Sequence, residues 1–332
     1  MASATERPAA VDYGGSFDEI TREMATAAFR QDPYALYARM RQQHPAYRSA
    51  QGLWYLTRYA DVEAALHNPR LSSDGQRFQR WQARQTGPPS DRGRIREWSR
   101  HIVDRPEFIP DPESLARIEQ TAEEFLDYLG NLVRERRAEP ADDLVSALVA
   151  VQERGDQLTD DELLSTCFLL LAAGHETTIN LIGNGMLALL RHPDQLRRLQ
   201  DDPALIRPAI EELLRYDSPV QMTSRIVAGG TEIAGQALGD GEFVFAVLGA
   251  ANRDPDRFSD PDRLDLGRAD NQYLSFGNGP HFCLGAPLAR LEGEVAIGAL
   301  VRRFPALRLD TDTVEWRPNP ALRGLESLPV AY

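Results

Sequence analysis

The chain has 332 residues and a formal net charge of −13, and all 37 of its basic side chains are arginine. A chain of this length can bury a large core without disulfide or metal staples. The acidic balance argues against non-specific binding to nucleic acid or to an anionic membrane surface, and the absence of lysine excludes Schiff-base and P-loop lysine chemistry.

The sequence also carries no signal for secretion or membrane insertion. Residues 1–12 lack the apolar core of a secretory signal, and no run of 18 apolar residues occurs. Two cysteines, Cys167 and Cys283, are too few for a disulfide framework. We therefore expect a cytoplasmic protein with neither a nucleic-acid partner nor a membrane partner.

In chain order, the first third alternates short elements with irregular stretches. Residues 1–16 are expected to form a flexible leader, and residues 17–332 a single domain. A helix begins near Pro33 and ends at His44, and strands at 46–48 and 53–57 are predicted to form a hairpin. A short helix follows at 59–67, and the Arg-, Pro- and Gly-rich residues 74–94 predict a linker or mobile loop.

The rest of the chain is mainly helical. Apolar residues at three- and four-residue spacing predict a helix over 115–137, and another covers 141–152. Thr159 and Glu162 form a capping box, which starts a helix that extends to about Leu190. Further helices are predicted at 193–200, 203–217 and 286–304, with short strands over 225–247 and 328–331 and a long loop over 252–285. The predicted fold class is mainly α with small peripheral β-sheets.

A glycine-rich loop, residues 276–285, holds Cys283 just before the last long helix. Glycines around a single cysteine indicate a loop shaped to surround the sulfur with backbone N–H groups. A generic reactive or buried cysteine is the alternative. A phosphate-binding loop fits poorly because no Gly-Lys-Ser/Thr sequence is present, and a zinc site fits poorly because His281 and Cys283 lack two further ligands at finger-like spacing.

Four motifs together resemble the cytochrome P-450 superfamily. The first is its haem-binding signature, matched at every fixed position by Phe276, Gly277, Gly279, His281, Cys283 and Gly285. Residues 173–178 resemble its oxygen-activation motif, residues 212–215 its Glu-x-x-Arg pair, and residues 261–263 the site of the arginine that joins that pair. The chain is most similar to soluble bacterial haem-thiolate monooxygenases that hydroxylate macrolides and other polyketides.

The resemblance implies a cofactor, haem b (iron protoporphyrin IX), and a set of residues that binds it. Cys283 would be the thiolate ligand of the haem iron, and His281 and Arg225 would bind the haem propionates. The remaining cofactor-binding residues implied are Phe276, Gly277, Gly285 and Ala173. For Arg225 the alternative is an ordinary surface position on a strand.

The resemblance also implies catalytic residues. Glu176 and Thr177 would relay protons; a threonine in mid-helix competes for backbone carbonyls, which favours a kink or bulge there. The alternative is a solvated Glu176 and a packed Thr177. Glu212, Arg215 and Arg263 would form a buried ion-pair network with a structural role.

Substrate and partners follow from the same resemblance. The expected substrate contacts are interpreted as apolar or small, consistent with a bulky apolar secondary metabolite: Val220, Gln221, Met222, Thr223 and Leu325. Because no Gly-x-Gly-x-x-Gly follows a strand, electrons from NAD(P)H would arrive through a ferredoxin and a ferredoxin reductase. The reaction would be hydroxylation or epoxidation by one atom of dioxygen.

The sequence departs from the family in one region. Several helices expected between the early hairpin and the middle helices are missing, and residues 74–88 stand in their place. The long central helix would lose packing partners and expose apolar area. Three alternatives stay open: a minimal working monooxygenase, a non-catalytic helper protein that resembles a P-450, or an internally deleted product that is poorly active.

Overall fold

The computed structural model describes residues 18–73, 112–153 and 158–332. The predictions for the leader at 1–16 and the irregular stretch at 74–94 lie outside these residues. The described helices are α1 (Glu19–Met24), α2 (Ala27–Gln31), α3 (Tyr34–Gln43), α4 (Tyr59–His67), α6 (Pro112–Ala138), α7 (Leu144–Glu153), α8 (Asp160–Arg191), α9 (Pro193–Asp201), α10 (Ile206–Tyr216), α11 (Leu248–Ala251) and α12 (Ala286–Arg303), with 3-10 turns η1 (Pro203–Leu205) and η2 (Gly279–His281).

The described strands are short and form three small sheets, which confirms the predicted fold class. They are β1 (Ala46–Arg48), β2 (Trp54–Leu56), β3 (Leu71–Ser72), β4 (Thr223–Val227), β5 (Thr231–Ile233), β6 (Gln236–Leu238), β7 (Phe243–Ala246), β8 (Arg308–Leu309) and β9 (Val330–Ala331). The largest sheet has the order β1-β2-β7-β4-β3. The predicted hairpin is its antiparallel β1–β2 pair, and β2 pairs in parallel with β7, about 190 residues further along the chain.

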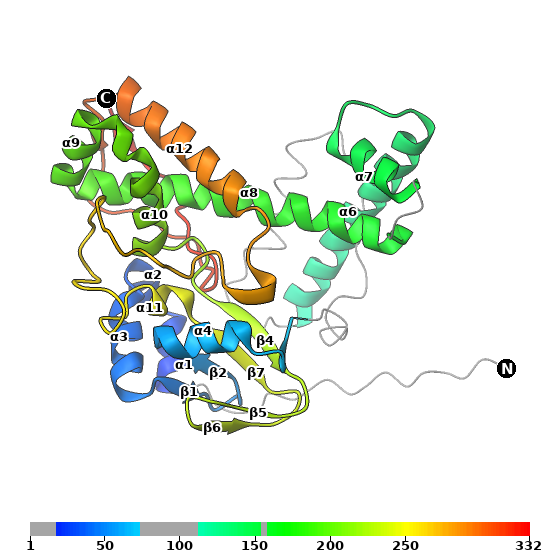
Figure 1. The fold of residues 1–332 in the computed structure, drawn as a ribbon, viewed down its shortest axis with the longest axis horizontal. Coiled ribbons are helices and arrows are strands. Elements are labelled where there is room, and N and C mark those ends of the chain that lie inside the picture. The colour runs from blue at the N-terminus through cyan, green and yellow to red at the C-terminus, as the bar shows by residue number, and fades with distance from the viewer. Residues whose placement is uncertain (1–17, 74–111, 154–157) are drawn as a thin grey trace.

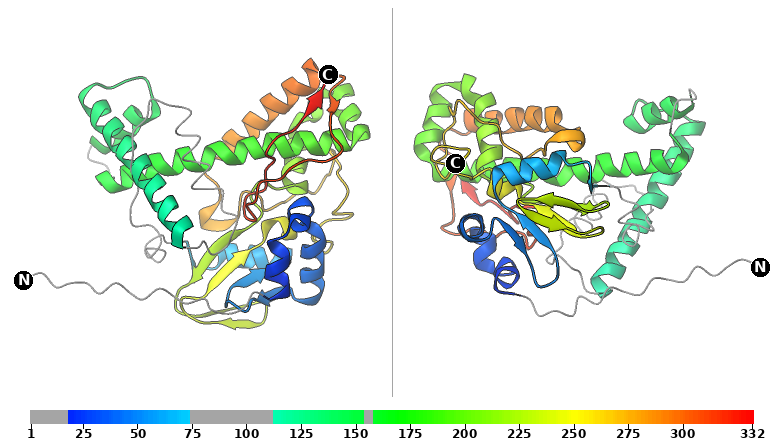
Figure 2. Two further views of the ribbon diagram at one scale, coloured as in Figure 1. Left: turned by 180° about the vertical axis from the view of Figure 1, so that it is seen from behind. Right: turned by 60° about the horizontal axis from the view of Figure 1, so that its bottom comes forward.

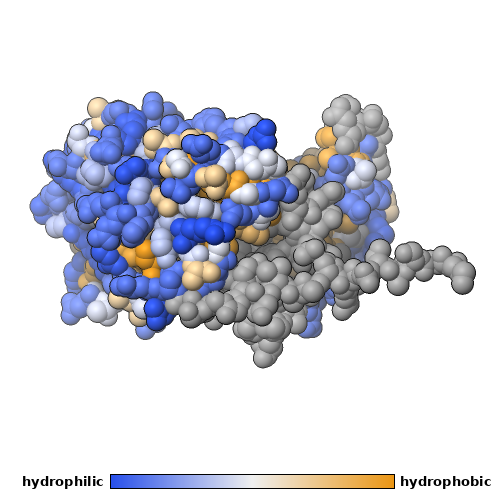
Figure 3. Space-filling view, turned by 90° about the horizontal axis from the view of Figure 1, so that it is seen from below, coloured by the Kyte–Doolittle hydropathy of each residue, from blue (hydrophilic) through white to orange (hydrophobic). Residues whose placement is uncertain are grey.

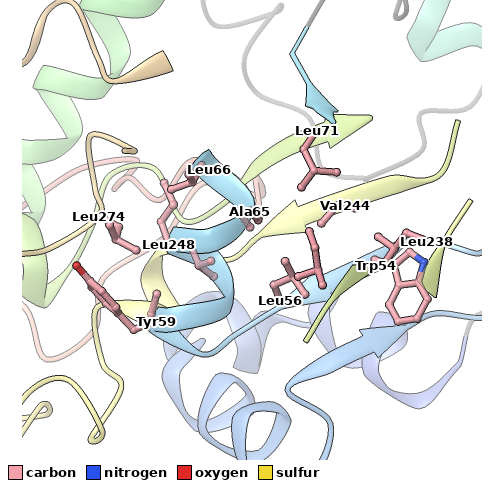
Figure 4. Close-up of a cluster of buried hydrophobic side chains, with 14 of the residues drawn as sticks. Trp54, Leu56, Tyr59, Ala65, Leu66, Leu71, Leu238, Val244, Leu248 and Leu274 are labelled. Carbon is pink, nitrogen blue, oxygen red and sulfur yellow. The ribbon is translucent and has the colours of Figure 1, made fainter. Parts of the chain in front are cut away.

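A hydrophobic cluster fixes this sheet to α4. Trp54 and Leu56 from β2, Leu71 from β3 and Val244 from β7 pack with Leu66 of α4 (Figure 4). Each of these side chains is less than a tenth exposed. The cluster packs the β3–β4 side of the sheet against α4. This side of the sheet contributes residues to the candidate functional site.

The long helix α8 runs across the molecule and organises the helical part (Figure 1). Helices α6 and α7 pack at its N-terminal end, whereas α9, α10 and α12 pack at its C-terminal end. Thr159 and Glu162 form both bonds of the predicted capping box. Gly185 permits the close approach at the other end, because a Cβ there would lie 3.0 Å from Ile297 of α12 and 3.2 Å from Leu213 of α10.

The C-terminal segment follows α8 back toward the sheet. In both views of Figure 2 it leaves the neighbourhood of α12 and passes along α8 to the helices near the N-terminus. Asn184 of α8 donates to the carbonyl of Arg323 at 2.9 Å, and the guanidinium of Arg323 reaches the carbonyls of Arg30 and Gln31. The segment therefore ties the C-terminal third of α8 to α2.

Several large apolar side chains are exposed on the helical part. On α8, Leu169 is 60% exposed, in line with the expected loss of packing partners. Four further exposed apolar side chains follow one another at helical spacing along α12: Leu284 just before the helix, and Leu288, Leu291 and Val295 within it. The face seen in Figure 3, by contrast, is mostly hydrophilic in its described part. No helix in the described residues is both long enough and apolar enough to cross a membrane.

Candidate functional site

The cysteine loop is folded as a tight connection into α12. The backbone N–H of Cys283 donates to the carbonyl of Phe276 at 2.9 Å, which closes the loop. Gly277 and Gly279 have φ values of +72° and +73°, a conformation that other residues adopt only with strain. A Cβ on Gly279 would also lie 2.7 Å from the carbonyl of Leu66, so this glycine sets the loop against α4. Cys283 itself is exposed.

The loop brings His281 to the edge strand of the main sheet. The ring Nε2 of His281 lies 2.9 Å from the hydroxyl of Ser73, the residue that follows β3. Because Ser72 pairs with Ile226 in antiparallel register, Ser73 comes next to Arg225 of β4. The register therefore places His281 and Arg225, the two predicted propionate ligands, at the same end of the β3–β4 pair.

Arg225 is a buried cation that has no acidic partner among the described residues. Its side chain is 6% exposed, which excludes the alternative of an ordinary surface position. Nη1 donates to the hydroxyl of Thr223 and to the carbonyl of Ser224, but Nε has no hydrogen-bond partner, and no carboxylate of the described residues pairs with this guanidinium. Burial lowers the pKa of Arg225. A buried, unpaired guanidinium is costly unless an anion binds to it.

Glu176 and Thr177 lie in the middle of α8. The Thr177 hydroxyl donates to the carbonyl of Ala173 at 2.8 Å, one turn earlier. This bond satisfies the hydroxyl within the helix, and α8 stays α-helical throughout, so the predicted bulge is absent. At Gly174 an added Cβ would meet no atom of the described residues within 4 Å, so these residues leave open space beside this part of the helix.

The Glu176 side chain is 1% exposed, so the alternative of a solvated carboxylate is wrong. Its Oε2 accepts a hydrogen bond from Nη1 of Arg317 in the C-terminal segment. Its Oε1 lies 3.4 Å from Nδ1 of His175, and neither of these two atoms has a hydrogen-bond partner in the part of the chain that the structure describes. Arg317 is a site residue that the sequence reasoning missed, because no short motif carries it.

The Glu-x-x-Arg pair is fully buried, with both side chains 0% exposed. Glu212 accepts two bonds of 2.8 Å from Arg215, and Arg215 also donates to the carbonyls of Asn252, Pro261 and Arg263. The prediction that the side chain of Arg263 completes the network is wrong. Only its backbone carbonyl takes part, while the side chain is exposed. The second cation of the network, besides Arg215, is Arg268, whose Nε lies 3.1 Å from Oε2 of Glu212.

The predicted substrate residues lie where the C-terminal segment meets the start of β4. Val220 bridges to Leu322, and the N–H of Gln221 donates to the carbonyl of Ala321. Met222 and Leu325 are each packed in a hydrophobic cluster of the core. Thr223 accepts the bond from Arg225 noted above. As substrate contacts these residues stay predictions.

Comparison with known proteins gives one consistent result. The cytochrome P450 family model matches residues 97–204 and 204–325. The chain is 47% identical over 242 residues to 6-deoxyerythronolide B hydroxylase of Saccharopolyspora erythraea, which covers 72% of this chain and 59% of that protein. It is 45% identical over 249 residues to the P450 monooxygenase PikC of Streptomyces venezuelae, covering 74% and 58%.

A solved structure agrees. The cytochrome P450 PksS of the bacillaene polyketide synthase of Bacillus subtilis 168 superposes with a TM-score of 0.81 and 32% identity, over 93% of this chain and 98% of that one. A mainly helical fold with a cysteine loop ahead of its last long helix defines the class of cysteine-ligated haem proteins. The chain belongs to the cytochrome P450 family. It spans about 60% of the length of the curated relatives that it matches.

The residues present fit the haem that the family implies. Cys283 is exposed at the start of α12 and is free to bind iron. Arg225 is a buried guanidinium that needs an anion, and a propionate is one. The open space at Gly174 gives room beside the motif in α8. The cysteine loop, the sheet edge and the centre of α8 are three different parts of the chain, and the features of each suit a bound haem.

Replacing Arg225 by an uncharged residue should have two effects of opposite sign: it should stabilise the haem-free protein and weaken haem binding. In Arg225→Met, we expect the haem-free protein to unfold at a higher temperature, because a buried uncompensated charge is removed. We also expect haem affinity to fall about 10- to 100-fold, since a charge-assisted hydrogen bond contributes roughly 1.5–3 kcal/mol. Thermal unfolding followed by circular dichroism and haem transfer to apomyoglobin measure the two effects.

The matched control for this prediction is Arg257→Met. Arg257 already has a carboxylate partner, Asp270, at 2.8 Å, so its loss should leave haem affinity unchanged and should not stabilise the haem-free protein. If Arg225→Met and Arg257→Met lose haem to the same extent, Arg225 is not a propionate ligand.

Proposed function

We propose that this protein is a haem-thiolate monooxygenase that inserts one atom of dioxygen into an apolar secondary metabolite of polyketide or macrolide type. The observation that carries the proposal is the exposed Cys283 in its closed glycine loop, at the start of the helix that packs on α8. The relative 6-deoxyerythronolide B hydroxylase supports the reaction class and the kind of substrate, and the monooxygenase PikC supports the reaction class.

The proposed binding roles follow from charge and position. Cys283 would bind the iron of haem b, and the bound haem supplies the activation of dioxygen. Arg225 and His281 would bind propionates at the end of the β3–β4 pair, and the cation at this buried position would orient the macrocycle. Phe276, Gly277, Gly285 and Ala173 would complete the surroundings of the group.

The proposed proton chemistry rests on Glu176 and Thr177. The Thr177 hydroxyl is held by the carbonyl of Ala173 and can pass a proton outward from the helix. Arg317 holds Glu176 through Oε2, and Oε1 has no hydrogen-bond partner among the described residues. A carboxylate fixed in this way would accept a proton at Oε1 and donate it to the hydroxyl of Thr177.

Substrate and electron donor belong to the same proposal. The predicted contacts around Val220 to Thr223 and Leu325 suit an apolar ligand. Electrons would come from NAD(P)H through a ferredoxin and its reductase, in the cytoplasm.

A reduced sample treated with carbon monoxide tests the proposal. A thiolate-ligated haem gives a strongly red-shifted Soret band, which we expect from the purified protein after haem reconstitution. If reconstituted protein binds no haem, or gives only the unshifted band, the enzyme proposal fails and the alternatives of a helper protein or a poorly active deleted product are favoured.

A further inference from the structure

Two ion pairs of opposite polarity connect α10 with α12. Arg290 of α12 donates to Glu211 of α10 through Nε at 2.7 Å and Nη2 at 3.3 Å. One helical turn away, Arg207 of α10 lies 3.3 Å from Glu294 of α12. The side chain of Arg207 is 82% exposed, whereas that of Arg290 is 29% exposed. Because exposed ion pairs contribute little to stability, the further contacts of the less exposed arginine carry more weight.

Arg290 also covers the aromatic ring at the start of the cysteine loop. Its guanidinium carbon lies 4.5 Å from the centre of the Phe276 ring. The carbonyl of Phe276 is the group that accepts the N–H of Cys283 at 2.9 Å and so closes the loop. A cation over an aromatic face is attracted by the electron density of the ring. The contact therefore connects the arginine of α12 with the bond that closes the cysteine loop.

A tyrosine completes the support of this guanidinium. The hydroxyl of Tyr273 donates to Oε2 of Glu211, and Nη2 of Arg290 donates to the same hydroxyl at 3.0 Å. The Tyr273 ring also lies beside the Phe276 ring, with 6.1 Å between the ring centres. A planar guanidinium that donates three hydrogen bonds to Glu211 and Tyr273 is fixed in orientation. It therefore stays over the ring of Phe276 rather than turning toward solvent.

We propose that Arg290 is a positioning residue for the iron ligand. It holds the ring of Phe276, and through the carbonyl of Phe276 it fixes the loop conformation that presents Cys283. Glu211 and Tyr273 orient the guanidinium for this task. Groups that hold a metal ligand in place decide how firmly it stays bound. The effect on the loop concerns the chain alone, whereas the effect on the iron ligand rests on the proposed function.

Amide hydrogen exchange in the haem-free full chain tests the effect on the loop. In Arg290→Met we expect the N–H of Cys283 to exchange about tenfold faster, because the contact that holds Phe276 is lost. The N–H of Val247, which donates to the carbonyl of Leu56 in the sheet, reports global unfolding and should change less. If both N–H groups accelerate equally, or if neither does, the proposal is overturned.

The matched control is Arg207→Met. It breaks the other ion pair between the same two helices and touches no part of the cysteine loop. We therefore expect the N–H of Cys283 to exchange at the unmodified rate in this variant. An acceleration as large as that in Arg290→Met would show that the link between α10 and α12 matters, and not the contact with Phe276, which contradicts the proposal.

Two milder variants decide the question if Arg290→Met does not fold. Arg290→Lys keeps a cation for the ring but cannot bind both oxygens of Glu211, so it should retain part of the protection. Tyr273→Phe keeps the ring and removes the hydroxyl, so it should accelerate exchange by less than Arg290→Met. If both variants exchange at the unmodified rate, neither the guanidinium fork nor the hydroxyl positions the loop, and the proposal is overturned.

The reconstituted protein tests the effect on the iron ligand. In dilute urea, after reduction and treatment with carbon monoxide, Arg290→Met should lose the red-shifted Soret band to the unshifted one about tenfold faster than the unmodified protein. Arg207→Met should keep the unmodified rate, and equal rates in the two variants overturn the role at the iron. If the unmodified protein gives no red-shifted band, the proposed function fails, while exchange in the haem-free chain still decides whether Arg290 holds the loop.

Discussion

Cys283→Ala is expected to abolish the red-shifted Soret band of the reduced, carbon monoxide-treated protein, while Cys167→Ala keeps it. Cys283 is exposed at the start of α12, in the loop closed by its own N–H. Cys167 is 3% exposed in the cluster between α6, α7 and α8, and burial raises the pKa of its thiol. A cysteine that is exposed in the haem-free chain can bind iron, whereas Cys167 is closed in by the side chains of its cluster.

The free energy of unfolding distinguishes loss of the iron ligand from a folding defect. We expect the variant that keeps the band, Cys167→Ala, to be the less stable of the two. Alanine at exposed Cys283 should change the free energy of unfolding of the haem-free protein by less than about 0.5 kcal/mol. Alanine at Cys167 removes a buried sulfur that packs near Phe125 and Leu163 and should cost about 1 kcal/mol. Denaturant unfolding and the spectrum are measured on the same samples. Loss of the band in both variants, or in neither, would show that the iron ligand is assigned wrongly.

Local sequence signals were sufficient to predict the position of most helices. The helix α4 has the predicted bounds, 59–67, and α8 was predicted over 160–190 and extends to Arg191. These elements are marked by capping residues and by proline or asparagine just beyond their ends, which act within a few residues. The short helices α1 and α2 were missed, because five or six residues hold too few apolar positions to show a period.

The polar networks were predicted only in part, because their partners are far apart in sequence. Glu212 and Arg215 are three residues apart on one helix face, and the pattern placed them together correctly. Arg317, the partner of Glu176, is 141 residues away in the sequence, and no local sequence pattern around Arg317 predicts this contact. The prediction of Arg263 failed for a different reason: the turn after Asp260 puts the carbonyl of residue 263 into the network, while its side chain is exposed.

The buried Glu212 gives the largest expected effect on stability. In Glu212→Gln the carboxylate that accepts from Arg215 and Arg268 becomes neutral, which leaves two cations without their counter-charge. Removing one partner of a buried pair costs about 3–5 kcal/mol, a large share of the roughly 5–15 kcal/mol that stabilises a typical domain. Urea unfolding followed by circular dichroism measures it. The control is Glu294→Gln, whose partner Arg207 is 82% exposed and which should cost less than about 1 kcal/mol.

Arg215→Lys distinguishes charge from geometry in the same network. The guanidinium donates to both oxygens of Glu212 and to three backbone carbonyls that surround it. Lysine keeps the positive charge but has three donors on one nitrogen, so it cannot reach all of these acceptors. We therefore expect Arg215→Lys to cost several kcal/mol by the same urea measurement. A cost below about 1 kcal/mol would mean that the site requires only a positive charge, and that the carbonyls of Asn252, Pro261 and Arg263 are satisfied in another way.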